Sequence, residues 1–197
     1  MWKRDQIVGR DLASQACLAA RLGLKHLLGN EPKVISQDSL ELSESEVRFD
    51  YVIGNPPFLN QLKLATASAD RLDVLEKLGI ERRGYMDSSS VFLLLAHLLT
   101  KDGGRCAMLL PDSFLAARDS GPVREYLREH SSLFGLWYGR QTVFDAGVHV
   151  IAPIFEKTTG QGKVERWVGP SFEPAKAASL EPNSSMGSLV ADLEGVP

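Results

Sequence analysis

The segment whose residue types most clearly suggest a chemical role is Asn-Pro-Pro-Phe at residues 55–58, directly after the apolar run Tyr-Val-Ile-Gly at 51–54. The strand-forming residues of that run predict a buried parallel strand. Two consecutive prolines end the strand, because they cannot donate to a strand ladder and each fixes its own φ. We therefore expect an amide side chain, rigid carbonyls and an aromatic ring just beyond the carboxyl end of a strand, where open α/β sheets bind their ligands.

This group of residues could grip a planar amine. An amine conjugated to a ring is a poor nucleophile, because its lone pair is delocalised. The side-chain oxygen of Asn55 and the carbonyl of Pro56 could each accept one amine hydrogen, which would draw the nitrogen toward a tetrahedral geometry and free its lone pair. Phe58 would stack on the ring and hold it in place. The alternative is a plain turn, since Asn-Pro-Pro also forms turns.

The pattern around this segment predicts an α/β fold. Apolar runs predict strands at 7–12, 34–40, 51–54, 105–110, 133–138, 148–155 and 163–168. Helical spacing predicts helices at 13–28, within 59–85, at 87–100, near 113–118 and at 121–129. Gly29 and Asn30 can end the first helix, Asp87 or Ser88 can cap the third, and the pair at 103–104 predicts a helix stop.

Asn-Pro-Pro-Phe resembles motif IV of the amino methyltransferases, which use S-adenosyl-L-methionine, and its surroundings resemble the adenine-specific DNA methyltransferases. Residues 7–12 look like motif II and residues 34–40 look like motif III. The resemblance implies that Asp11 takes the ribose hydroxyls of the cofactor, with Leu12 against the adenine. It also implies that Asp38, followed by Ser39, accepts from the cofactor's adenine amine. Both acids could instead be surface residues that end strands.

Two further motifs follow in the order that this family shows. Residues 87–92 resemble motif V, which implies that Phe92 lies beside the cofactor adenine, although its apolar neighbours fit core packing equally well. Residues 143–148 resemble motif VIII, which implies that Phe144 packs the other face of a flipped base, with a loop anchor as the alternative. The resemblance runs from residue 7 to about residue 157.

The resemblance implies a Rossmann-like methyltransferase fold with one departure. The family's motif I, a strand followed by a glycine-rich turn, should precede Ile7 and is absent from the sequence. We therefore expect an N-terminally truncated fold whose second and fourth family strands lack a neighbour along their inner edges, and little activity in the isolated chain. Residues 1–158 are expected to form the partial catalytic domain, and 159–197 a linker or the start of a further domain.

The function that follows is transfer of a methyl group from S-adenosyl-L-methionine to the amine of a flipped adenine in duplex DNA, in restriction-modification or phage defence. An RNA guanine-amine or protein glutamine methyltransferase is the alternative, as is a non-catalytic remnant or the subunit of a split enzyme. The expected partners are DNA, a missing N-terminal segment or partner subunit, and a separate target-recognition domain.

Bulk properties constrain the class further. The chain has 197 residues, of which 44% are hydrophobic, so a domain with a real core is expected. No apolar run is long enough to cross a membrane, the first residues are unlike a signal peptide, and two cysteines fit a reducing compartment, so we expect a cytoplasmic protein without a membrane partner. His and Cys residues lack ligand spacing, and no metal site is predicted.

The net charge of -3 is unusual for a DNA binder. The positively charged side chains within 63–83 and 118–140 could bind DNA, or they could simply form solvent-exposed helix surfaces.

Overall fold

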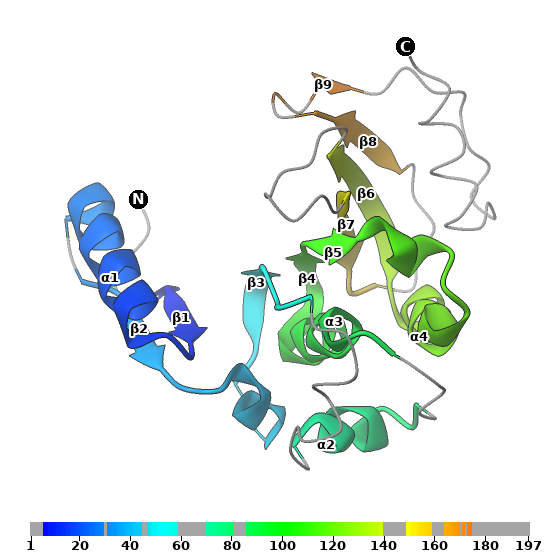
Figure 1. Cartoon of the computed structure of the whole chain (residues 1–197), viewed down its shortest axis with the longest axis horizontal. Coiled ribbons are helices and arrows are strands. Elements are labelled where there is room, and N and C mark those ends of the chain that lie inside the picture. Colours follow the sequence, from blue (N-terminus) through cyan, green and yellow to red (C-terminus); the bar gives the residue numbers. More distant parts are fainter. Residues whose placement is uncertain are drawn as a thin grey trace. The chain divides into compact units, whose positions relative to one another are not determined.

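The structure is a computed structural model that describes residues 6–29, 31–44, 47–58, 70–80, 86–139, 149–158, 164–169, 171 and 173–174. The chain divides into two compact units (Figure 1), residues 1–45 and residues 46–197, here called unit 1 and unit 2.

Unit 1 is a β-α-β element. Strand β1 (Val8–Asp11) leads into helix α1 (Ser14–Leu28), which returns the chain to strand β2 (Lys33–Ser36). The strands pair in parallel. Helix α1 ends at Gly29, whose φ of 73° lies in the left-handed region that glycine adopts without strain. The predicted strand, helix and helix stop are confirmed, and a 3₁₀ segment (Ser39–Glu44) follows β2.

Unit 2 is built on a mixed sheet, in the strand order β3-β4-β7-β6-β8-β9. The pairs β3–β4 and β6–β8 are parallel, whereas β4–β7, β6–β7 and β8–β9 are antiparallel. The short strand β5 also pairs with β7. The strands are β3 (Phe49–Gly54), β4 (Thr100–Met108), β5 (Leu110–Pro111), β6 (Ser132–Gly139), β7 (Val150–Glu156), β8 (Glu165–Val168) and β9 (Glu173–Pro174).

The described residues of unit 2 include the α-helices α2 (Asp70–Lys77), α3 (Ser88–Leu99) and α4 (Gly121–His130). Helix α3 is apolar on nearly all sides, and such helices are buried. It packs on β3 and β4 (Figure 1), and Leu93 and Leu94 are fully buried. The helix predicted near 113–118 forms as 3₁₀ turns at Asp112–Leu115 and Arg118–Ser120. The predicted α/β architecture is confirmed.

The prediction that β3 is buried is wrong. Strand β3 is the end strand of its sheet, with β4 as its only strand neighbour among the described residues. Tyr51 is 62% exposed and Ile53 is 82% exposed. Both side chains point to the same face because strand residues alternate between the two faces. One face of β3 is therefore apolar and open.

The prediction that Gly103 and Gly104 stop a helix is also wrong. Helix α3 ends at Leu99, and both glycines lie inside β4. A Cβ on Gly104 would lie 2.7 Å from the carbonyl oxygen of Asp50 in β3, so this glycine permits the close approach of two strands. The register of the β3–β4 pair shifts between Phe49 and Tyr51, next to this approach.

Within the described residues, no helix combines the length and the apolar character that a membrane span requires.

Candidate active site

The Asn-Pro-Pro-Phe segment leaves the carboxyl end of β3 as the sequence predicts. Strand β3 ends at Gly54, whose carbonyl accepts a hydrogen bond from the backbone N–H of Leu109 at 3.0 Å. A Cβ on Gly54 would lie 2.7 Å from the sulfur of Met108, which is near the end of a flexible side chain. The loop therefore begins from a fixed point beside β4.

The loop presents its predicted groups unequally. Asn55 is exposed, Pro56 is buried, and Phe58 is half-buried. The carbonyl of Pro57 accepts a hydrogen bond from the hydroxyl of Ser88 at 2.7 Å. An exposed amide thus lies next to a buried proline, in a loop held at both ends.

The amino end of helix α3 lies against this loop through Ser88. Asp87 caps the helix, since its side chain accepts from the N–H of Ser89 at 2.7 Å, and the predicted cap is confirmed. Phe92 follows one turn later and is half-buried, whereas Val91 and Leu93 beside it are buried. Phe92 thus shares a helix with the residue that contacts the loop.

In unit 1 the predicted acids follow the ends of two paired strands. Asp11 is the last residue of β1, and Asp38 follows the end of β2 by two residues. The N–H of Gln37 donates to the Asp11 carbonyl at 3.1 Å, which joins the two strand ends. The structure thus brings Asp11, Leu12, Asp38 and Ser39 to one edge of this small sheet.

In each of these two aspartates, one carboxylate oxygen accepts a hydrogen bond from a backbone N–H two residues later. Oδ1 of Asp11 accepts from the N–H of Ala13 at 2.7 Å, and Oδ1 of Asp38 accepts from the N–H of Leu40 at 3.0 Å. Among the described residues, Oδ2 of Asp11 and Oδ2 of Asp38 have no hydrogen-bond partner. Leu12 is 72% exposed, so an apolar side chain lies open beside an open carboxylate. This set of groups fits a ligand that carries hydroxyls and a flat apolar ring.

The predicted residues thus form two groups. Asp11, Leu12, Asp38 and Ser39 lie in unit 1, and residues 55–58 and Phe92 lie in unit 2. Phe144 lies outside the described residues.

Sequence reasoning missed the contact between Ser88 and Pro57. The two residues are 31 positions apart, and no local pattern links them. It also missed the role of Arg124, a predicted local cation, which donates to the carbonyls of Phe114 at 2.6 Å and of Ala117 at 2.9 Å. This guanidinium holds the 3₁₀ turns after β5, and partial burial lowers its pKa.

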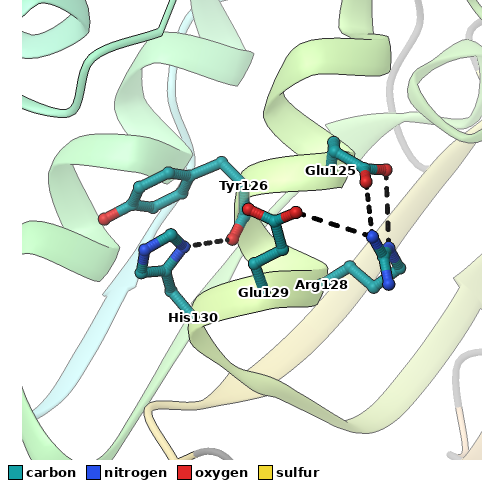
Figure 2. A network of polar contacts seen from close by, with 5 residues as sticks. All are labelled: Glu125, Tyr126, Arg128, Glu129 and His130. Atoms are coloured by element: carbon teal, nitrogen blue, oxygen red, sulfur yellow. Dashed lines mark hydrogen bonds and ion pairs between the residues drawn. The ribbon is translucent and has the colours of Figure 1, made fainter.

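A second polar group lies on the surface of α4 (Figure 2). Arg128 pairs with Glu125 and, at 3.6 Å, with Glu129, while the ring of Tyr126 stacks on His130 with 4.2 Å between centroids. Glu125, Tyr126, Glu129 and His130 line an open cavity of about 600 Å³ together with the turn after α2. Pairs spaced by one helical turn are typical of a solvated helix face. For Arg128 the structure supports the solvated alternative.

The fold and the loop at the end of β3 define a class of protein, the Rossmann-like methyltransferases. A sequence description of the family "Eco57I restriction-modification methylase" matches residues 6–144. Because that match covers well over half of the chain, the protein belongs to the Eco57I restriction-modification methylase family.

Individual relatives agree with this family. The type II methyltransferase M.BanIII of Aneurinibacillus aneurinilyticus is 25% identical over 179 residues, which cover 84% of this chain and 30% of that protein. The chain therefore spans about a third of the length of this curated relative.

Solved structures show the same fold. A protein assigned to the class I S-adenosylmethionine-dependent methyltransferases, from Listeria monocytogenes, matches with a TM-score of 0.63 and 17% identity, over 95% of this chain and 54% of that one. The type ISP restriction-modification enzyme LlaGI, solved with a DNA substrate mimic, matches with a TM-score of 0.63 and 12% identity, over 95% of this chain and 22% of that one.

Proposed function

We propose that this chain is the core of an adenine-specific DNA methyltransferase of a restriction-modification or phage-defence system. It transfers a methyl group from S-adenosyl-L-methionine to the exocyclic amine of an adenine flipped out of duplex DNA. The observation that carries the proposal is the loop at residues 55–58, which places an exposed amide and a fixed backbone at the carboxyl end of β3. The family supports it, because its members are restriction-modification methylases.

The role of the loop follows from its chemistry. Asn55 Oδ1 and the Pro56 carbonyl accept the two hydrogens of the adenine amine, and Phe58 stacks on the base. The prolines keep both acceptors in place without reorganisation, and preorganised polar groups contribute strongly to catalysis. The amine proton released on transfer passes to solvent, because the two amide oxygens accept hydrogen bonds but are too weakly basic to take the proton. Phe144 packs the other face of the base in this proposal.

In this proposal, residues of unit 1 bind the cofactor. The free carboxylate oxygen of Asp11 takes ribose hydroxyls, Leu12 packs on the adenine, and Asp38 and Ser39 bind its polar edge. S-adenosyl-L-methionine supplies the electrophilic methyl group when bound. Leu12 is 72% exposed, so its side chain is accessible to a flat apolar ring, as this assignment requires.

The active enzyme includes more than this chain. Within the described residues, β1 pairs only with β2 and β3 pairs only with β4, and the face of β3 that carries Tyr51 and Ile53 is open. Free strand edges are normally covered in native proteins. We propose that a further strand, from a segment outside these residues or from a partner subunit, adds to the free edge of β3. A separate target-recognition domain reads the DNA sequence.

The test is methyl transfer from labelled S-adenosyl-L-methionine to unmethylated bacterial duplex DNA. The chain is expressed both alone and from a genomic fragment with its flanking sequence, and modified nucleosides are identified after digestion. We expect N6-methyladenine from the second preparation. Transfer only to ribosomal RNA or to a release factor, offered in parallel, would overturn the assignment to DNA.

Asn55→Ala tests the role of the loop. We expect the rate to fall by at least about two orders of magnitude, because one of two preorganised acceptors is lost, with cofactor affinity nearly unchanged. Asn55→Asp is the matched control, since it keeps an oxygen acceptor of the same length and should retain more activity than the alanine variant. An unchanged rate in Asn55→Ala would show that the segment is only a turn.

A further inference from the structure

Several backbone torsions of the loop at residues 55–58 are restricted. The proline rings fix φ at Pro56 and Pro57. The carbonyl of Gly54 is held by the N–H of Leu109 at 3.0 Å, and the carbonyl of Pro57 is held by the hydroxyl of Ser88 at 2.7 Å. The Pro57 carbonyl belongs to the peptide plane that leads into Phe58, so the Ser88 bond restricts ψ of Pro57, the angle that orients this plane.

We propose that Ser88 is a positioning residue of the active site, which fixes the direction of the Phe58 ring by holding the carbonyl of Pro57. This inference rests on the proposed function, in which Phe58 stacks on the target base.

Ser88 is not needed to cap its helix. Asp87 provides the cap by accepting from the N–H of Ser89. The Ser88 hydroxyl donates instead to a carbonyl 31 residues earlier in the chain, and Ser88 is fully buried. The bond is partly buried, so it is partly shielded from competition with water and constrains the loop more firmly than a fully exposed bond does.

The neighbouring serines show that the bond is specific to Ser88. Ser88, Ser89 and Ser90 are all fully buried at the start of α3. Among the described residues, the hydroxyls of Ser89 and Ser90 have no hydrogen-bond partner. The burial of three hydroxyls therefore does not by itself produce such a contact, and Ser90 is a natural control for Ser88.

The consequence for catalysis lies in geometry. Without the Ser88 bond, the peptide between Pro57 and Phe58 can rotate, and the ring no longer meets the base at one angle. Small misplacements of a reacting group cost up to about a hundredfold in rate. Cofactor affinity should not change, because in the proposed function Ser88 contacts the base-binding loop and not the cofactor.

The first measurement needs no activity. In the 197-residue chain with labelled phenylalanine and proline, NMR compares Ser88→Ala, Ser88→Thr and Ser90→Ala with the unchanged protein. We expect Ser88→Ala to shift the Pro57 carbonyl signal and to broaden or split the Phe58 ring signals, while Ser88→Thr and Ser90→Ala leave both in place. Equal signals in Ser88→Ala and the unchanged protein would overturn the positioning role. If Ser88→Thr fails to fold, the comparison of Ser88→Ala with Ser90→Ala decides alone.

The second measurement is methylation of unmethylated bacterial duplex DNA by the complete enzyme. We expect Ser88→Ala to lower kcat by about ten- to a hundredfold with the KM for S-adenosyl-L-methionine unchanged, and Ser90→Ala to lower neither. An unchanged kcat in Ser88→Ala overturns the inference. A complete lack of DNA methylation by the unchanged enzyme would refute the proposed function, and the NMR result would still decide whether Ser88 positions the loop.

Discussion

At the scale of single residues, His97 is the titratable group whose state depends most on the fold. It lies in α3, is 1% exposed, and places Nε2 3.3 Å from the carbonyl oxygen of His130, while its Nδ1 has no partner among the described residues. Burial, reinforced by the charge of Lys157, lowers the pKa of His97 from 6.5 to about 4. The imidazole is therefore neutral in the folded protein at neutral pH.

This residue makes stability depend on pH. Between pH 6.5 and pH 4 the unfolded chain binds a proton at His97 that the folded chain excludes, so the stability present above pH 6.5 is lost as the pH falls toward 4. The loss between pH 7 and pH 5 is about 2 kcal/mol. Urea denaturation at both pH values, followed by fluorescence, should show a smaller fall for His97→Gln than for the unchanged protein.

The matched control for this experiment is His26→Gln, which replaces an exposed histidine near the end of α1. It should keep the full pH dependence. The same fall in His97→Gln and in the unchanged protein would contradict the assignment.

At the scale of elements, the contact between β3 and β4 sets the position of the catalytic loop. The two strands run in parallel, so their carboxyl ends lie at the same edge of the sheet. Gly104 lets β4 approach Asp50 at the start of this contact. At its end, the carbonyl of Gly54 accepts a hydrogen bond from the N–H of Leu109. The β3–β4 contact therefore sets where the loop at residues 55–58 begins.

Gly104→Ala should destabilise unit 2. The added Cβ would lie 2.7 Å from the Asp50 carbonyl and 3.0 Å from the Lys101 carbonyl, which are backbone atoms that move only with their strands. Overpacking of this kind costs about 1–3 kcal/mol. Gly121→Ala is the control, since its Cβ would have no neighbour nearer than 3.9 Å. Thermal unfolding should separate the two variants, and equal midpoints would contradict the close approach.

Local signals explain which elements were predictable. Asp87 caps α3, Pro122 opens α4, and Gly29 ends α1, because each residue acts through its own backbone or its nearest turn. The double glycine at 103–104 misled the prediction, because its cause is a contact with Asp50, which lies about 50 residues earlier in the chain. The bond from Ser88 to Pro57 was invisible for the same reason. The residue types of the site could be predicted from the sequence, but the contacts that hold its loop in place could not.

At the scale of the whole molecule, we expect the open face of β3 to promote self-association of the isolated chain in solution. Ile53 and Tyr51 are exposed on an end strand, and end strands with exposed apolar side chains tend to pair with other chains. The burial predicted for this strand from sequence was wrong, because the composition of a strand does not reveal whether another layer covers both of its faces.

Ile53→Lys should reduce self-association of the isolated chain. A charge on an end strand opposes pairing with a second copy, and Ile53 is too exposed for the change to disturb the core. Light scattering at increasing protein concentration should show a lower average mass than for the unchanged chain. Val47→Lys, at a 56% exposed position before β3, is the matched control and should associate as the unchanged chain does. Equal association of Ile53→Lys and the unchanged chain would exclude this face as the contact.

The strand order of unit 2 also dictates when the protein can fold during its synthesis. Strand β7 lies between β4 and β6 in the sheet, yet it is made after both. Arg105 in β4 meets Glu156 in β7 across 51 residues of chain. Until β7 has been synthesised, β4 and β6 lack the strand that lies between them in the sheet. Pairings between segments so distant in sequence form slowly. The nascent chain must therefore wait, with its apolar strands uncovered, for a segment that arrives some fifty residues after β4, and a chain ending before that segment would not complete its sheet.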